Sequence, residues 1–172
     1  MTINSLLKKI KKETPQSSIQ SGEGELLKFL ARKIKAKIIV ETGTKYGYSA
    51  IVLATTGAKV YTVDKKKKAK EAQENITARE NIEKANKLGL NITFEISEAV
   101  EFLKKFDKKI DLLFLDSRHT IDHIKRELQA VNGKISKSGI IVIHDILTSL
   151  GHPLNSKDNG ILIIKQNQIC SQ

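Results

Sequence analysis

The chain has 172 residues, an apolar fraction of 40% and a formal net charge of +11. This length predicts one domain, residues 1–172, that buries a sizeable core. No apolar run approaches the roughly 20 residues that cross a bilayer, and lysines soon after the N-terminus argue against a secretory signal. We therefore expect a cytoplasmic protein without a membrane partner. The single Cys170 excludes an internal disulfide.

Lysine supplies most of the positive charge. Residues 1–40 contain nine Lys or Arg and three Glu, an excess of +6, and a second basic block is DKKKKAK at 64–70. A basic chain can bind nucleic acid. Base recognition, however, usually uses arginine forks and stacking aromatic rings, which are scarce near these lysines. We interpret the lysines as solvated surface and keep nucleic acid as a less favoured partner.

The N-terminal region predicts an arm followed by a helix. We expect residues 1–21 to form a helical arm, which Pro15 and polar residues separate from the rest. GELLKFLARKIK (24–35) then repeats apolar side chains at the spacing of one helical face, namely Leu27, Leu30, Ala31 and Ile34.

Strands and helices alternate along the rest of the chain. Strands are predicted at 37–41, 59–64, 91–96, 110–116, 139–145 and 160–166. Helices are predicted at 48–55, 67–88, 97–106 (with Ser97 as N-cap) and 121–131. Apolar runs such as LLFL and IIVI are typical of strands buried on both faces. The pattern predicts an α/β fold, a three-layer Rossmann-like sandwich with a mostly parallel sheet of about six strands and a shortened C-terminal part.

Carboxylates close four of the predicted strands. They are Glu41, Asp64, Asp116 and Asp145. Ligands of open parallel sheets bind beyond the carboxyl ends of the strands, so these acids are expected to share one edge. Carboxylates desolvated together repel one another unless cations or hydrogen-bond donors join them. The sequence therefore predicts a ligand site at this edge.

The loop ETGTKYGYSA (41–50) indicates which ligand. Its glycines lack the G-x-G-x-x-G spacing of dinucleotide sites, and Glu41 would repel a pyrophosphate but attract an amine. Gly43 and Gly47 allow close backbone approach, and Ser49 can offer its hydroxyl and backbone N–H to a carboxylate. Asp64 suits ribose hydroxyls. An amino acid joined to a ribose describes S-adenosylmethionine.

The segment VETGTKYGYSAIVLA resembles the first motif of class I S-adenosylmethionine-dependent methyltransferases. Its GYS is similar to the catechol and caffeoyl-CoA type of O-methyltransferase. GEGELLKFL, VYTVD, SEAVEFL, DLLFLDSRHT and SGIIVIHDIL also resemble this family, so the resemblance covers roughly residues 22–147. It implies a set of cofactor-binding residues: Glu41, Gly43, Thr44, Gly47 and Ser49 at the methionine end, Asp64 at the ribose, Glu98 and Ala99 at the adenine, and Asp116 beside them.

The resemblance also implies a catalytic group. Methyl transfer to an alcohol or phenol needs an aligned acceptor that loses a proton or binds a metal. In the family, the acid after strand four binds a divalent cation and a base lies three residues later, which implies Asp116 and His119. The related macrolide and glycopeptide-sugar methyltransferases also show this D-x-x-H pattern. Histidine titrates near neutral pH, which suits a general base.

The chain departs from the metal-using relatives after strand five. They carry D-N or D-D where this chain has Asp145 and Ile146. Asp116 and Asp145 are thus the predicted ligands of a Mg²⁺ that keeps several waters. Alternatively, His144 and Asp145 form a hydrogen-bonded pair that orients a base, or His144 is a core residue of its strand. Arg118 and His152 are further candidates for the substrate pocket.

Three functions are compatible with these observations. The leading prediction is an enzyme that methylates an oxygen of a small hydroxylated molecule, with catalytic residues His119, Asp116 and Asp145. The charge of +11 suggests an RNA methyltransferase, although no N/D-P-P-Y/F motif is present. The incomplete metal set and short C-terminal part suggest a non-catalytic protein that binds S-adenosylmethionine. Because acceptor-selecting loops vary freely, the sequence leaves the acceptor and the oligomeric state open.

Overall fold

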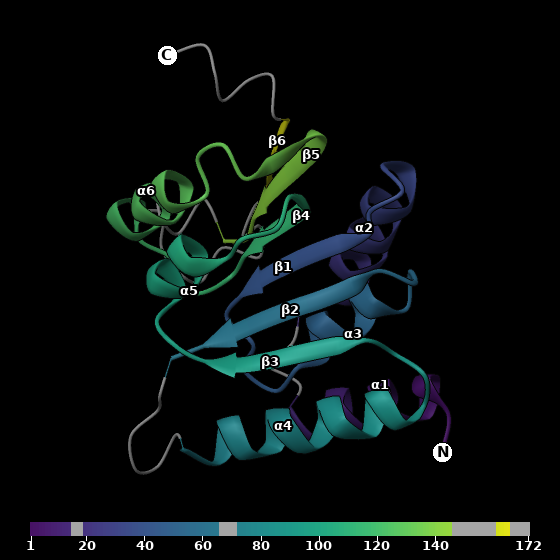
Figure 1. The fold of residues 1–172 in the computed structure, drawn as a ribbon. Helices are drawn as coiled ribbons and strands as arrows, with labels where there is room; N and C mark the ends of the chain where they lie inside the picture. Colours follow the sequence, from purple (N-terminus) through teal and green to yellow (C-terminus); the bar gives the residue numbers. More distant parts are fainter. Residues whose placement is uncertain (15–18, 66–71, 146–160, 166–172) are drawn as a thin grey trace.

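The computed structural model describes residues 1–14, 19–65, 72–145 and 161–165. Within these ranges, six strands form one sheet in the order β3-β2-β1-β4-β5-β6 (Figure 1). The strands are Ile38–Thr42 (β1), Lys59–Asp64 (β2), Ile92–Ile96 (β3), Ile110–Leu115 (β4), Ile135–Ile143 (β5) and Leu162–Lys165 (β6). Strands β1 to β5 are parallel, and β6 runs antiparallel to β5.

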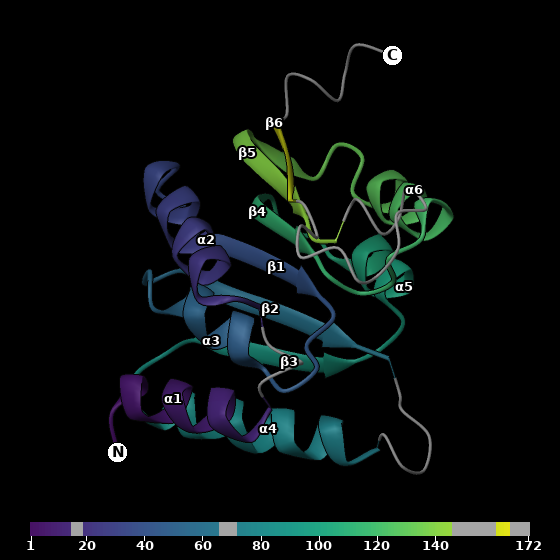
Figure 2. The ribbon, with the colours of Figure 1, turned by 180° about the vertical axis from the view of Figure 1, so that it is seen from behind.

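Helices cover both faces of this sheet. They are Ile3–Glu13 (α1), Ser21–Lys33 (α2), Tyr48–Ala54 (α3), Ala72–Lys87 (α4), Ala99–Lys105 (α5) and Ile121–Ala130 (α6). Figures 1 and 2 show α5 and α6 on one face, and α2 and α3 on the other with α1 and α4 beside them. The predicted three-layer α/β sandwich is confirmed. In the described part of the chain, every helix is too short or too polar to serve as a membrane span.

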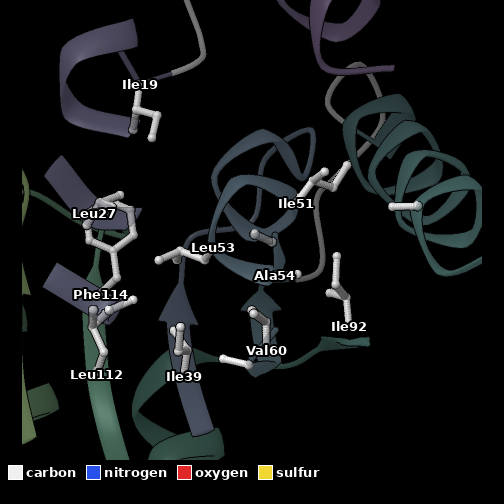
Figure 3. Close-up of a cluster of buried hydrophobic side chains, with 14 of the residues drawn as sticks. Ile19, Leu27, Ile39, Ile51, Leu53, Ala54, Val60, Ile92, Leu112 and Phe114 are labelled. Atoms are coloured by element: carbon white, nitrogen blue, oxygen red, sulfur yellow. The ribbon is translucent and has the colours of Figure 1, made fainter. Parts of the chain in front are cut away.

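The alternating direction of side chains along each strand explains why the core has two layers. Ile39 of β1 packs with the α1–α4 layer, whereas the next residue, Val40, packs with the α5–α6 layer. Phe114 and Leu115 of β4 divide in the same way. Successive side chains of a strand point to opposite faces, so strands buried on both sides need continuous apolar runs. Figure 3 shows part of the α1–α4 side, where Leu27, Ile51 and Leu53 gather over the sheet.

Within the described residues, two helix or strand boundaries differ from the sequence prediction by three residues or more, and one N-cap assignment differs. Helix α2 begins at Ser21 rather than residue 24, and the Gln20 N–H donates to Glu23 Oε2 at its N-terminus (2.5 Å). Strand β5 begins at Ile135, because a register irregularity lets Ile135 pair with Ile110 ahead of the apolar run. The N-cap of α5 is Glu98, so the assignment of Ser97 was wrong. Residues Ile146, His152 and Cys170 lie outside the described residues, as does the start of the helix predicted from 67.

Candidate active site

The carboxyl ends of the parallel strands form one edge of the sheet, as predicted. Backbone hydrogen bonds continue the strand pairing past the last paired residues. Asp116 N–H donates to Thr42 O (2.9 Å), His144 N–H to Leu115 O (3.0 Å) and Gly43 N–H to Val63 O (2.8 Å). The backbone that leaves each strand is therefore held at the edge, which brings the residues after β1, β4 and β5 close together.

A pocket opens at this edge between β2, α5 and α6. It is lined by Gly43, Val63, Asp64, Lys65, Glu98, Ala99, Ser117, Arg118 and His123. Four of the predicted cofactor residues therefore share one pocket: Gly43, Asp64, Glu98 and Ala99. Arg118 and Glu98 form an ion pair there, at 3.8 Å. The sequence prediction did not include His123 and Ser117. Ser117 lies within DLLFLDSRHT, but the resemblance assigned it no role, and His123 lies outside the segments that resemble the family.

The glycine loop approaches the neighbouring strand closely. Gly43 has φ of 94°, and a Cβ on it would lie 2.2 Å from the carbonyl oxygen of Asp116. Only glycine fits this conformation and this spacing. Farther along the loop, Lys45 N–H donates to Asp64 Oδ2 (2.8 Å) and Asn81 Nδ2 donates to Tyr46 O (3.1 Å). The loop is thus fixed to β2, β4 and α4 by its backbone.

Glu41 lies beneath this loop and does not line the pocket. Its side chain is fully buried, and Thr62 Oγ1 donates to Glu41 Oε2 (2.5 Å) while Thr44 Oγ1 contacts Thr62 Oγ1 (2.6 Å). Burial raises the pKa of Glu41 to about 8, although hydrogen bonds from Ser49 and Thr62 oppose the shift. Within the described residues, Glu41 Oε1 is buried without a hydrogen-bond partner. This oxygen can still accept a donor.

A second cluster surrounds His144, which directly follows β5. Its Nδ1 lies 3.1 Å from Asp116 Oδ1 and 3.2 Å from Asp145 Oδ1, and its Nε2 lies 3.1 Å from Glu23 Oε1. Burial alone would lower the pKa of His144, but the three carboxylates outweigh it and raise the pKa to about 12. The same pairing with His144 lowers the pKa of Glu23. His144 is therefore an imidazolium held by three acids.

His119 faces this cluster from the loop between β4 and α6. Its Nε2 lies 3.7 Å from Asp145 Oδ2 and 3.9 Å from Asp116 Oδ1, and its side chain is 32% exposed. The predicted Asp116, His119 and Asp145 are thus brought together. Glu23 was not predicted, since it lies 121 residues from His144 along the chain and its contact depends on how α2 packs.

A buried acid also supports this loop. Glu127 of α6 is 1% exposed, and Ser117 Oγ donates to its Oε1 (2.9 Å). Burial raises the pKa of Glu127 to about 7, against hydrogen bonds from Thr42 and Ser117. His123, one helical turn earlier, is 4% exposed. The apolar residues of 121–131 predicted this helix, but they did not reveal that two polar residues share its buried face.

A family model described as a methyltransferase domain matches residues 40–146. The chain belongs to this methyltransferase family. The matched segment contains all nine predicted cofactor residues and ends one residue after Asp145. The sequence-based identification of an S-adenosylmethionine-dependent methyltransferase is therefore confirmed at the level of the family. No curated protein matches the chain.

Solved structures show the same methyltransferase fold. An O-methyltransferase from Bacillus cereus in complex with SAH is 21% identical, with 91% of this chain and 72% of that chain covered and a TM-score of 0.66. An SAH-bound methyltransferase from Podospora anserina is 22% identical (82% and 60% covered, TM-score 0.67). An O-methyltransferase from Streptomyces achromogenes in complex with SAM is 19% identical (92% and 71% covered, TM-score 0.64). At these identities the likeness shows the fold.

The donor set of this methyltransferase does not fit a divalent cation. Asp116 Oδ1 and Asp145 Oδ1, the predicted ligands, both face the His144 ring at ion-pair distance. In residues 1–14, 19–65, 72–145 and 161–165, no three His, Cys, Asp or Glu side chains form a group that could hold a metal. Mg²⁺ prefers an octahedron of oxygen ligands, whereas here a ring nitrogen, His144 Nδ1, lies 3.1 Å and 3.2 Å from the two predicted ligand oxygens. The geometry therefore does not support the predicted Mg²⁺.

Glu127→Gln is expected to stabilise the methyltransferase above neutral pH. The folded-state pKa of Glu127, about 7, exceeds the ordinary value of 4.5, so the unfolded chain loses this proton first. The wild-type free energy of unfolding should therefore fall by roughly 3 kcal/mol between pH 4.5 and 7, because each pKa unit corresponds to about 1.4 kcal/mol. Above pH 7 it should level off. Glutamine keeps an acceptor for Ser117 and carries no charge.

Urea denaturation at pH 4.5 and pH 8 measures this effect as the difference between variant and wild type. Glu95→Gln, at an exposed acid of β3, is the matched control for the loss of one charge. If Glu127→Gln raised the free energy of unfolding by the same amount at both pH values, the raised pKa of Glu127 would be contradicted.

Proposed function

We propose that this methyltransferase transfers the methyl group of S-adenosylmethionine to a hydroxyl oxygen of a small molecule, with His119 as general base. The observation that carries the proposal is the position of His119, which is partly exposed and lies beside Asp116 and Asp145 at the edge that holds the pocket. We also propose that residues 1–172 act as one domain. The Bacillus and Streptomyces proteins are O-methyltransferases, which supports oxygen as the acceptor atom.

The cofactor would be held by the residues predicted for it. Asp64, Glu98 and Ala99 line the pocket and would take the ribose and adenine. The methionine end would meet the loop of Gly43 to Ser49, where Glu41 Oε1 is a buried acceptor without a partner among the described residues. This orphaned oxygen fits an ammonium group, which supplies a charged hydrogen-bond donor. When bound, S-adenosylmethionine supplies a methyl group on a positively charged sulfur.

His119 lies beside the acid cluster at the place where the acceptor proton would go. Its Nε2 is 3.7 Å from Asp145 Oδ2 and 3.9 Å from Asp116 Oδ1, so two carboxylates flank the nitrogen that would receive the proton. As the oxygen–carbon bond forms and the carbon–sulfur bond breaks, the acceptor proton would pass to the nitrogen of His119. No step requires a metal ion.

A methyl-transfer screen tests this function. The purified protein is incubated with methyl-labelled S-adenosylmethionine and a panel of phenols and aliphatic alcohols, with EDTA or with Mg²⁺. Label should appear in a small hydroxylated acceptor at equal rates in both conditions. Strict dependence on Mg²⁺ would overturn the metal-free mechanism. Label found only in added RNA would favour an RNA methyltransferase. Cofactor binding without transfer to any acceptor would favour a non-catalytic protein.

A further inference from the structure

His123 is a buried polar residue in the pocket for which the proposed mechanism has no role. It lies in the first turn of α6, is 4% exposed, and lines the pocket together with Asp64, Glu98 and Ala99. Its Nε2 is buried and has no hydrogen-bond partner among the described residues. Buried polar atoms in native proteins are usually satisfied, so a missing partner often indicates a ligand or water.

The contacts of the ring identify Nε2 as a donor. Arg126 Nη2 lies 3.3 Å from His123 Nδ1. A guanidinium can only donate, so Nδ1 accepts and the proton of a neutral imidazole resides on Nε2. Burial lowers the pKa of His123, and the charges of Arg118 and Arg126 lower it further, so the ring stays neutral near pH 7.

The neighbouring acid does not satisfy this donor. Glu127 Oε1 lies 3.6 Å from His123 Nε2, beyond hydrogen-bond distance, and it already accepts from Ser117 Oγ. Nε2–H is therefore available to donate a hydrogen bond into the pocket. None of the other residues that line the pocket has an aromatic ring or a side-chain amide. A flat base with unprotonated ring nitrogens would complete this hydrogen bond.

We propose that His123 reads the adenine of the cofactor by donating its Nε2–H to an unprotonated ring nitrogen of the base. This inference rests on the proposed binding of S-adenosylmethionine and adds the residue that selects its base. Adenine has three such acceptors, N1, N3 and N7. Replacing the recognised nitrogen by C–H would leave the buried donor unsatisfied, which costs more than the hydrogen bond alone contributes.

Binding of deaza analogues tests the assignment without requiring turnover. Calorimetry compares S-adenosylhomocysteine with its 1-deaza, 3-deaza and 7-deaza forms. For the wild type, one analogue should bind about tenfold more weakly than the parent compound, which corresponds to a typical cost of an unsatisfied buried donor. His123→Leu, which removes the donor and keeps a similar volume, should bind the parent compound more weakly and lose the discrimination. His123→Gln should restore part of it.

The controls separate this inference from the proposed function. Asp122→Asn, an exposed neighbour on α6, should leave all four affinities unchanged. Equal binding of all analogues by the wild type, or discrimination that persists in His123→Leu, would overturn the role of His123. Wild-type binding decides the question even if His123→Leu does not fold. Absence of any binding to the wild type would overturn the proposed cofactor as well, whereas binding without methyl transfer would overturn only the proposed catalysis.

Discussion

Gly43→Ala is expected to destabilise the protein by roughly 2–5 kcal/mol and to abolish cofactor binding. The residue has φ of 94°, so any side chain strains the backbone, and the added Cβ would lie 2.2 Å from Asp116 O and 2.6 Å from Asp116 C. Both are backbone atoms that cannot move independently of β4. Relief of the clash would push apart the glycine loop and the loop that carries Asp116 and His119.

Gly57→Ala is the matched control for this substitution. Gly57 has nearly the same φ, 88°, but a Cβ there would have no atom within 4 Å. It should therefore cost only the backbone strain, roughly 1–2 kcal/mol. Urea denaturation measures stability, and calorimetry with S-adenosylhomocysteine measures binding. Equal losses of stability in the two variants would show that the close approach of Gly43 to Asp116 contributes nothing.

His119→Ala is expected to lower kcat by about 10²–10⁴-fold, the usual range for loss of a general base. Stability and affinity for S-adenosylhomocysteine should stay close to wild type. The side chain is partly exposed and approaches only the edge of the acid cluster, at 3.7 Å and 3.9 Å from its nearest carboxylate oxygens. Turnover with the acceptor found by the screen measures the effect, and added imidazole should restore part of it.

Thr120→Ala serves as the control on the same loop. Thr120 is exposed and precedes α6 without a side-chain cap hydrogen bond, so its truncation should leave kcat within a small factor of wild type. A His119→Ala variant with wild-type kcat would exclude the proposed base. A loss of kcat matched by an equal loss in Thr120→Ala would indicate that loop conformation, and not proton transfer, limits the reaction.

Much of the fold could be predicted because the relevant patterns are local. The run VYTVD ends where β2 ends, at Asp64, and the runs LLFL and IIVI lie in β4 and β5, buried on both faces. Alternation of such strands with helices leaves a parallel sheet as the favoured arrangement. The boundaries that were missed, at Ser21 and Ile135, depend on a capping contact and on a register irregularity, which have no periodic signal.

The sequence by itself determined the alternation of strands and helices and the parallel sheet that follows from it. It also determined the edge where Glu41, Asp64, Asp116 and Asp145 lie, since parallel strands bring their carboxyl ends to one side. Only the tertiary structure decided which groups share a contact there. It joins Glu23 of α2 to His144 after β5 and turns Asp116 and Asp145 toward that ring. It also buries His123 and Glu127 on one face of α6, where His123 lines the pocket. Such contacts link residues far apart in the chain. The periodicity of apolar residues shows which face of a helix or strand is buried, but it does not show which groups a polar side chain contacts on that face.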